Sequence, residues 1–339
     1  MYTKREELEM ASVAMKAIAN DRYGAPEDLR LEDRAIPELE PDSVLLRVRA
    51  ASINPYDWHQ VRGTPLIVRL IIGLRGPQPA IPGIDVAGIV EEVGAEVTEF
   101  RPGDEVIGSC SATFAEYARG GAPDIVIKPA ALSFEEAAAL PGAGVTALQA
   151  LRAGGAEKGS RVLINGASGG VGTYAVQIAK SLGAHVTGVC SSTNVDLVRS
   201  LGADAVIDYT QEDFTRGSVK YDVVLDNVGN HPLRRLGGIV AREGVVVAVG
   251  GGGGRLGRRL VGGLGRKVMA RLRTRFGSTK MIGFRASVTK DDLAALVSLV
   301  ADGAVTPVID RTYSLEEVPV AIRYVEAGHT RGKVVISVT

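Results

Sequence analysis

The chain has 339 residues, and its 39 basic and 39 acidic side chains leave no formal net charge. This balance excludes a general affinity for polyanions such as nucleic acids. The two cysteines, Cys110 and Cys190, are too few for a disulfide framework or a four-thiolate zinc site. The length predicts two domains, since one core rarely extends over so many residues.

The N-terminal residues 1–15 are rich in charge and lack the apolar run of a signal peptide. No other run approaches the roughly 20 apolar residues that a membrane span requires. Together with the low cysteine content, these features predict a cytoplasmic protein.

The first third of the chain predicts a domain rich in β-strands. Short strand-like runs occur at residues 45–52, 87–94 and 104–110, and Gly and Pro residues separate them. Short strands divided in this way are typical of an antiparallel or barrel-like domain.

From about residue 144 the pattern changes to strands that alternate with segments long enough for helices. The strands are predicted at 161–165, 185–190, 205–209, 222–228 and 245–250. They are continuously apolar, as expected for a parallel sheet that is buried on both faces. We therefore predict a doubly wound α/β domain.

The C-terminal part begins with a helical stretch at 291–303. Two apolar runs follow at 306–313 and 332–338. The last run predicts a strand, which we expect to return to the first domain.

The sequence NGASGGVG at 165–172 follows a predicted strand and precedes a helical pattern at 173–183. Its Ala167-x-Gly169-x-x-Gly172 matches the dinucleotide-binding fingerprint, with Ala in the first position. Because Gly169 has no side chain, the backbone can approach a pyrophosphate, which free N–H groups at the helix N-terminus bind. The alternative is a glycine-rich turn without a ligand.

The second predicted strand ends in CSSTN at 190–194, where an NAD site usually has an acid. The next acid, Asp196, comes within the following predicted helix. Hydroxyl and amide groups accept a 2′-phosphate that a carboxylate repels, so the turn favours NADPH over NADH. The turn contains no Arg or Lys, which leaves NADH possible, and Ser191 and Ser192 alternatively serve as turn and capping residues.

Several stretches resemble one known family, in order along the chain. They are ASINPYDWHQVRG (51–63), PGIDVAGIVEEVG (82–94), RPGDEVIG (101–108), LPGAGVTALQAL (140–151), LGADAVIDY (201–209) and GHTRGKVVISV (328–338). The chain resembles the zinc-independent quinone oxidoreductases (zeta-crystallin-like) among the medium-chain dehydrogenases/reductases. The resemblance implies a homodimer and three regions of the chain. These are an N-terminal extension at 1–14, a GroES-like substrate domain at 15–140 and 285–339, and a Rossmann domain at 141–284.

The chain departs from the zinc-dependent members of that family. Where they carry a cysteine it has NPYD at 54–57, and where they carry His-Glu it has Ile84-Asp85. Its four histidines show no ligand-like spacing, so we expect no metal. Without zinc as a Lewis acid, we expect hydride transfer to quinones or α,β-unsaturated carbonyls, whose conjugation carries the charge onto an oxygen.

The resemblance suggests the candidate catalytic residues. Asn54 matches a position beside the nicotinamide and the substrate, with an Asn-Pro turn as the alternative. Tyr56 is a candidate donor to the developing oxyanion or else a packing residue. Asp57 orients its neighbours or caps a short helix. Thr146 resembles a residue at the nicotinamide end, and its alternative role is to cap a helix N-terminus.

Further cofactor-binding candidates lie at strand ends. Tyr209 resembles a residue beside the 2′-phosphate, and Phe284 one whose backbone meets the carboxamide. Lys333 resembles a basic residue near the cofactor, with a surface turn as the alternative. The complete cofactor set is Asn54, Thr146, Ala167, Ser168, Gly169, Gly170, Val171, Cys190, Ser191, Ser192, Asn194, Tyr209, Val228, Val249, Gly250, Phe284 and Lys333.

Residues 255–280 contain seven Arg, two Lys and no acid. Basic residues alternate there with apolar ones, which predicts a basic amphipathic helix. Its interpretations are a solvated face, a flap over the substrate entrance, and a contact with a membrane or polyanion. We favour the first two and expect no nucleic-acid or membrane contact.

Taken together, these features predict an NADPH-dependent reductase that transfers hydride to quinones or other conjugated carbonyls without zinc. An enoyl or 2-alkenal double-bond reductase is the nearest alternative, since it uses the same cofactor site with a different pocket. The alternative from another class is an NADPH-binding protein whose basic segment contacts nucleic acid or a membrane.

Overall fold

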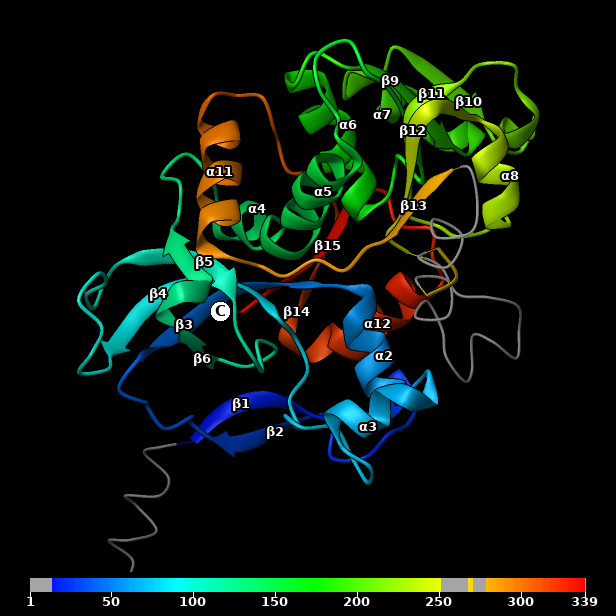
Figure 1. Ribbon diagram of the computed structural model, residues 1–339. Helices are drawn as coiled ribbons and strands as arrows, with labels where there is room; N and C mark the ends of the chain where they lie inside the picture. Colours follow the sequence, from blue (N-terminus) through cyan, green and yellow to red (C-terminus); the bar gives the residue numbers. More distant parts are fainter. Residues whose placement is uncertain (1–13, 251–267, 271–278, 339) are drawn as a thin grey trace, which may run out of the picture.

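The computed structural model describes residues 14–250, 268–270 and 279–338. Within these ranges the chain forms two halves, each built around its own large sheet (Figure 1). The strands are β1 (Ala14–Ala19), β2 (Arg30–Ala35), β3 (Ser43–Ile53), β4 (Asp85–Val93), β5 (Glu105–Ser109), β6 (Tyr117–Gly121), β7 (Ile125–Ile127), β8 (Arg161–Asn165), β9 (His185–Cys190), β10 (Ala205–Asp208), β11 (Tyr221–Asp226), β12 (Val240–Ala248), β13 (Lys280–Gly283), β14 (Ile309–Ser314) and β15 (Lys333–Ser337). The helices are α2 (Pro55–Arg62), α3 (Arg69–Ile72), α4 (Phe134–Ala138), α5 (Pro141–Gly154), α6 (Gly170–Ser181), α7 (Val195–Ser200), α8 (Leu233–Gly238), α11 (Lys290–Ala301) and α12 (Val318–Glu326).

The first sheet has seven strands, in the order β14-β15-β3-β4-β5-β7, with β6 also paired to β3. The pairs among β3 to β7 are antiparallel, as the short strands and turn residues predict. β15 comes from the end of the chain and pairs antiparallel with β3. The predicted return of the C-terminal strand is therefore confirmed. β1 and β2 form a separate two-stranded sheet.

The second sheet has six parallel strands in the order β10-β9-β8-β11-β12-β13. This is the Rossmann order, and the direction of winding reverses between β8 and β11. Ligands of such sheets bind at the carboxyl ends of the strands near that reversal. β12 begins at Val240, before the predicted start at 245. The predicted start was too late because Arg242 and Glu243 interrupt the apolar run of the strand.

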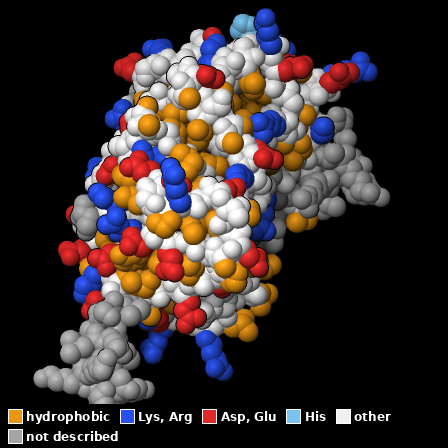
Figure 2. All heavy atoms as spheres, turned by 90° about the vertical axis from the view of Figure 1, so that its left-hand side faces the viewer, with side chains coloured by type: hydrophobic (Ala, Val, Ile, Leu, Met, Phe, Trp, Pro, Cys, Tyr) orange, Lys and Arg blue, Asp and Glu red, His pale blue; other side chains and the backbone are white. Residues whose placement is uncertain are grey.

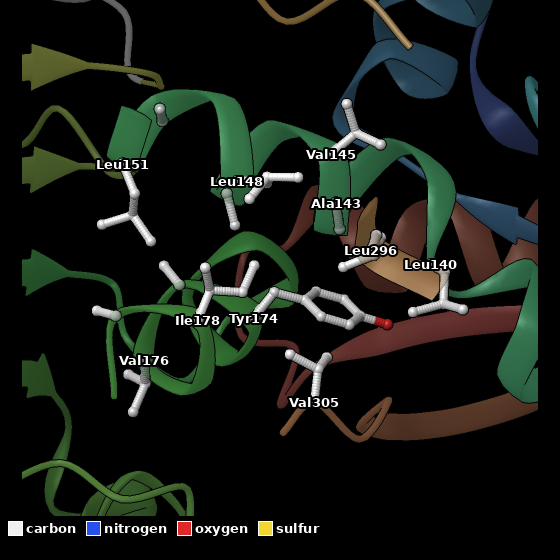
Figure 3. Packing of buried hydrophobic residues seen from close by; sticks show 14 of the residues in the cluster. Leu140, Ala143, Val145, Leu148, Leu151, Tyr174, Val176, Ile178, Leu296 and Val305 are labelled. Atoms are coloured by element: carbon white, nitrogen blue, oxygen red, sulfur yellow. The ribbon is translucent and has the colours of Figure 1, made fainter. Parts of the chain in front are cut away.

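One hydrophobic cluster joins the two halves. It contains Ala87 of β4 as well as Leu225 of β11 and several side chains of α5 and α6. Figure 3 shows the ring of Tyr174 on α6 between side chains that include Ala143 and Leu140. The Tyr174 hydroxyl donates a hydrogen bond to the Ala139 carbonyl at 3.0 Å. The two sheets therefore share part of their core.

The surface carries both signs of charge. On the face shown in Figure 2, Lys and Arg side chains are interspersed with Asp and Glu side chains, which agrees with the zero net charge. Residues 1–13 of the predicted extension lie outside the described residues, as do 255–267 and 271–278 of the basic stretch. None of the helices that the structure describes is both long enough and apolar enough to cross a bilayer.

Candidate cofactor and active site

The glycine loop connects β8 to α6 at the carboxyl edge of the second sheet. Gly166 has a φ of 81°, a left-handed value that favours glycine. A Cβ on Gly172 would lie 2.0 Å from the Gly166 carbonyl oxygen. A Cβ on Gly169 would meet nothing closer than 3.6 Å. Gly166 and Gly172 therefore shape the loop, whereas Gly169 leaves open space beside it.

The N-terminus of α6 is available to an anion. Gly169 is the N-cap residue and has no side chain that caps the helix. The first N–H groups of a helix lack internal partners and carry a partial positive charge, so this turn fits a pyrophosphate. Val228, which follows β11, adjoins the same loop, because a Cβ on Gly166 would lie 2.7 Å from its Cγ2.

A distant segment contacts the glycine loop. The Gly332 N–H donates to the Ser168 carbonyl at 2.9 Å, and Gly332 forms a β-bridge with Gly169. A Cβ on Gly170 would lie 3.1 Å from Cδ of Lys333. The structure therefore brings Lys333 beside the predicted pyrophosphate site.

The turn after β9 is tied to the same loop. Nδ2 of the buried Asn194 donates to Ser168 Oγ at 3.1 Å and to Ser191 Oγ at 3.2 Å. Asn194 Oδ1 is buried and has no hydrogen-bond partner within the described part of the chain. A buried acceptor without a partner costs about 1–3 kcal/mol, so a hydroxyl of a bound ribose fits there. Burial, and to a lesser extent the charge of Asp208, raise the pKa of the Cys190 thiol to about 11. A buried, protonated thiol of this kind favours a packing role for Cys190.

An acid that sequence reasoning missed lies at this edge. Ser192 Oγ donates to Asp208 Oδ2 at 2.5 Å, and Thr210 Oγ1 donates to Asp208 Oδ1 at 2.7 Å. These bonds lower the pKa of Asp208, with the Ser192 bond contributing most, so the carboxylate is charged at neutral pH. β10 pairs with β9 so that Asp208 lies opposite Cys190. Asp208 could have been predicted to lie here, because the carboxyl ends of neighbouring parallel strands meet at the same edge of a sheet. Tyr209 follows Asp208 and is half exposed.

A buried polar cluster connects β3, β4 and β15. Lys333 Nζ donates to Asn54 Oδ1 at 2.7 Å and lies 3.4 Å from Asp85 Oδ2. Asn54 Nδ2 donates to Asp85 Oδ2 at 2.9 Å, and the Gly142 N–H donates to Asp85 Oδ1 at 3.0 Å. The surface-turn alternative for Lys333 is therefore wrong, because its side chain is 3% exposed. Both polar ends of the Asn54 amide are held inside the cluster.

Asp57 lies next to this cluster and is fully buried. Its Oδ2 accepts a 2.7 Å hydrogen bond from the Asn54 N–H, so it caps α2. Burial, as the largest effect, raises its carboxyl pKa to about 7 against the lowering effect of that bond. Of the two predicted roles, the structure shows the helix cap.

Tyr56 is 41% exposed on the first turn of α2. Burial and then the Asp57 charge raise the pKa of its phenol, while the charge of Arg285 lowers it. Arg285, which follows β13, is a second residue that sequence reasoning missed. Thr146 donates its hydroxyl to the Gly142 carbonyl within α5 at 2.5 Å, so the N-terminal capping alternative is wrong.

The remaining predicted residues lie at the ends of the central strands. The N–H groups of Val249 and Gly250, which follow β12, both donate to the Asp226 carbonyl. Phe284 is buried after β13, and its N–H donates to the Ala248 carbonyl at 3.1 Å. The glycine loop after β8, Val228 after β11 and these residues after β12 and β13 therefore follow four neighbouring strands of one sheet.

The described residues do not fit a zinc ion. Across 14–250, 268–270 and 279–338, no three His, Cys, Asp or Glu side chains gather as a metal site. The carboxylate of Asp85 is already bonded through both oxygens, to Gly142 and to Ser52 and Asn54. The preceding Ile84 has no ligand atom.

Comparisons with known proteins agree with this architecture. A family model for the alcohol dehydrogenase GroES-like domain matches residues 40–176, and a zinc-binding dehydrogenase model matches residues 201–336. The mitochondrial NAD(P)H oxidoreductase RTN4IP1 of Mus musculus is 35% identical, with 96% of this chain and 90% of that protein covered. The 2-methylene-furan-3-one reductase of Solanum lycopersicum is 35% identical, with 95% and 79% covered. The Escherichia coli quinone oxidoreductase complexed with NADPH has a TM-score of 0.78 at 26% identity, with 95% and 99% covered.

The fold and the glycine loop define a dinucleotide-binding oxidoreductase with a GroES-like first half. The chain belongs to the medium-chain dehydrogenase/reductase family, as a quinone oxidoreductase-like member. The predicted family and fold class are thus confirmed.

Proposed function

We propose that this enzyme uses NADPH to reduce quinones and related α,β-unsaturated carbonyls and needs no metal. One observation carries the proposal. Gly332 contacts the glycine loop at the N-terminus of α6, and the next residue, Lys333, belongs to the cluster with Asn54 and Asp85. The predicted pyrophosphate site therefore lies beside a polar site that has no zinc ligands. The names of the relatives, which include an NAD(P)H oxidoreductase and a 2-methylene-furan-3-one reductase, support the same class of reaction.

When bound, the nicotinamide cofactor supplies the hydride. The residues of the chain then have separate tasks. The N–H groups of α6 would hold the pyrophosphate, and Asn194 Oδ1 would accept a hydrogen bond from a ribose hydroxyl. Tyr56 is protonated at neutral pH, as any phenol is whose pKa is not lowered, and it would donate to the substrate oxygen as negative charge develops. Arg285 adds positive charge near that phenol, and Asp57 positions Tyr56 by capping α2.

The preference for NADPH over NADH is the finer part of the proposal. NADPH is supported by the donors in the 191–194 turn and by the solved complex of the Escherichia coli quinone oxidoreductase with NADPH. The charged carboxylate of Asp208 beside Ser192 opposes a 2′-phosphate. We therefore propose that the enzyme accepts NADPH with a weak preference and also uses NADH.

The test is to follow oxidation of NADPH by its absorbance with soluble short-chain quinones, alkenals, enoyl thioesters and simple ketones, with NADH in parallel. We expect turnover of quinones or alkenals, unchanged by a chelator. Turnover confined to simple ketones and abolished by chelator would contradict the metal-free mechanism. Faster turnover of alkenals than of quinones would favour the double-bond reductase, and tight NADPH binding without any turnover would favour the binding-protein alternative.

A further inference from the structure

The segment that follows α2 exposes large apolar side chains. Leu66, Leu70, Ile71 and Leu74 are exposed to 48%, 72%, 78% and 72%. Among the other large hydrophobic residues that the structure describes, exposure does not exceed 53%. Single exposed apolar residues are ordinary, whereas a group of them marks an interaction surface. We call these four residues the 66–74 patch.

The patch has a defined local geometry. Its residues lie on the short helical turn η2 (Leu66–Val68), on the adjoining α3, and just after it. Leu66 and Leu70 are four residues apart across the adjoining η2 and α3, which places helical side chains on one face, whereas Leu74 follows the end of α3 at Gly73. Ile72 points into the protein and is buried. In Figure 1, α3 lies at the edge of the molecule below α2.

Contacts beneath the patch hold it in place. The guanidinium of Arg69 lies 4.4 Å from the centroid of the Tyr23 ring, and its Nε donates to the Gly63 carbonyl at 2.9 Å. The Tyr23 hydroxyl donates to the Gly73 carbonyl at 2.5 Å. The Arg69 guanidinium and the Gly63 and Gly73 carbonyls are thus bonded on the inner side of the segment, and the apolar side chains of the patch face outward.

The rim of the patch is positively charged. Residues 58–84 contain three Arg and no Asp or Glu, and one of the three, Arg62, is paired with Glu326 of α12. Arg75 is exposed and forms no ion pair with any residue that the structure describes. Arg22 is also exposed and forms no ion pair with any described residue. It lies close to the end of the patch, because its Cα would be 3.9 Å from a Cβ on Gly76. The neighbouring carboxylate of Asp21 is already paired with Arg34 at 2.6 Å.

The sequence led us to expect no membrane contact, but on the exposed side chains of this other segment we propose that the 66–74 patch docks on an anionic membrane surface, from which the enzyme takes a lipid-soluble quinone. Aliphatic side chains enter the boundary between headgroups and acyl chains, and exposed Arg residues are attracted to anionic lipids. Because α2 carries Tyr56 and leads into the patch, docking brings the candidate site close to the bilayer. The choice of substrate rests on the proposed function, whereas the docking itself does not.

Charge distinguishes a membrane from a second copy of the chain. A two-fold contact places the same surface on both partners. It would therefore bring Arg22 and Arg75 of one copy towards the same cations of the other, while the neighbouring Asp21 is already paired with Arg34. An anionic surface compensates these charges instead.

The test is flotation of the protein with vesicles. We expect it to float with equimolar phosphatidylcholine and phosphatidylglycerol, less with phosphatidylcholine alone, and less at high salt. The double variant L70E/I71E should lower the bound fraction by about tenfold or more, because both exposed side chains become charged. The matched control V219E changes another half-exposed apolar residue, in the other half of the molecule, and should float like the wild type.

Three outcomes would overturn the docking proposal. They are a wild type that does not float with anionic vesicles, binding that L70E/I71E leaves intact, and a dimer that dissociates in L70E/I71E without vesicle binding. The last outcome would assign the patch to a second copy.

A paired activity assay separates docking from the proposed function. L70E/I71E should reduce a short-chain quinone in buffer at the wild-type rate, but a long-chain isoprenoid quinone in anionic vesicles at least about tenfold more slowly. Equal rates of the two proteins on the vesicle-bound quinone would contradict the substrate assignment. Failure of the wild type on the short-chain quinone would instead contradict the proposed function, while flotation would still decide the docking.

Discussion

Asp208 presents a charged carboxylate beside Ser192, where the ribose of a bound cofactor would end. Replacing Asp208→Asn removes the negative charge and keeps an oxygen acceptor for Ser192. We expect NADPH affinity to rise about fivefold relative to NADH, because the repulsion between the Asp208 carboxylate and a 2′-phosphate is removed. Fluorescence titration of both nucleotides measures the ratio. Asp196→Asn, at a fully exposed side chain on α7, serves as the control and should leave it unchanged.

The carboxyl of Asp57 makes stability depend on pH. Its pKa is raised from 3.8 to about 7, so the folded protein keeps a proton that the unfolded chain releases. Stability is therefore lost as pH rises from about 4 to about 7, by at most roughly 1.4 kcal/mol per pH unit. Asp57→Asn removes this contribution and retains an oxygen for the Asn54 N–H. Urea denaturation of both proteins at several pH values measures it, and a stability difference independent of pH would refute it.

Lys333 neutralises the buried cluster around Asn54. Lys333→Met leaves the Asp85 carboxylate buried without a cation, and we expect a loss of about 3–5 kcal/mol in the free energy of unfolding. Adding Asp85→Asn should recover part of it, since an amide needs no counter-ion. Lys180→Met removes the more exposed ion pair with Asp204 and should cost about 1 kcal/mol or less. Equal losses for the two lysine variants, measured by urea denaturation, would contradict the structural importance of the cluster.

At the scale of elements, the β8–α6 turn contains two glycines with different requirements. Gly172→Ala places a Cβ 2.0 Å from the Gly166 carbonyl oxygen, so the loop must move. Gly169→Ala meets no protein atom closer than 3.6 Å, and its Cβ obstructs only a ligand. We expect Gly172→Ala to lower both thermal stability and NADPH affinity, and Gly169→Ala to lower the affinity about tenfold with little change in stability.

Calorimetric melting curves and NADPH titration of both variants separate the two effects. Gly238→Ala on α8 is the control, because its Cβ would meet no atom within 4 Å. If Gly169→Ala binds NADPH like the wild type, the pyrophosphate does not approach that position.

At the scale of the whole molecule, the shared core predicts that the two halves unfold together. Trp58 is the single tryptophan and packs against the core of the first half. The cluster with Ala87 and Leu225 connects that half to the second sheet. We expect tryptophan fluorescence and far-ultraviolet circular dichroism to show coincident urea transitions, as cooperative unfolding requires. A fluorescence transition at clearly lower urea would show that the first half unfolds independently.

Local patterns revealed much of the architecture. Continuous apolar runs predicted β8 and β9 over their observed ranges, and the run at 291–303 predicted α11 closely. The glycine loop was recognised because its steric requirements act between residues that are close in sequence, such as Gly166 and Gly172. The order of the strands in each sheet was not in any local pattern, since it depends on which strands pair.

The composition, the alternation of strands and helices and the 165–172 loop thus determined the fold class and the pyrophosphate turn from the sequence alone. Only the tertiary structure decided which polar groups meet. Lys333 and Asn54 are 279 residues apart and contact each other because β15 pairs with β3. Asp208 reaches Ser192 because β10 lies beside β9. Local sequence governs backbone shape and burial, whereas contacts between distant side chains follow from sheet order, to which the whole chain contributes.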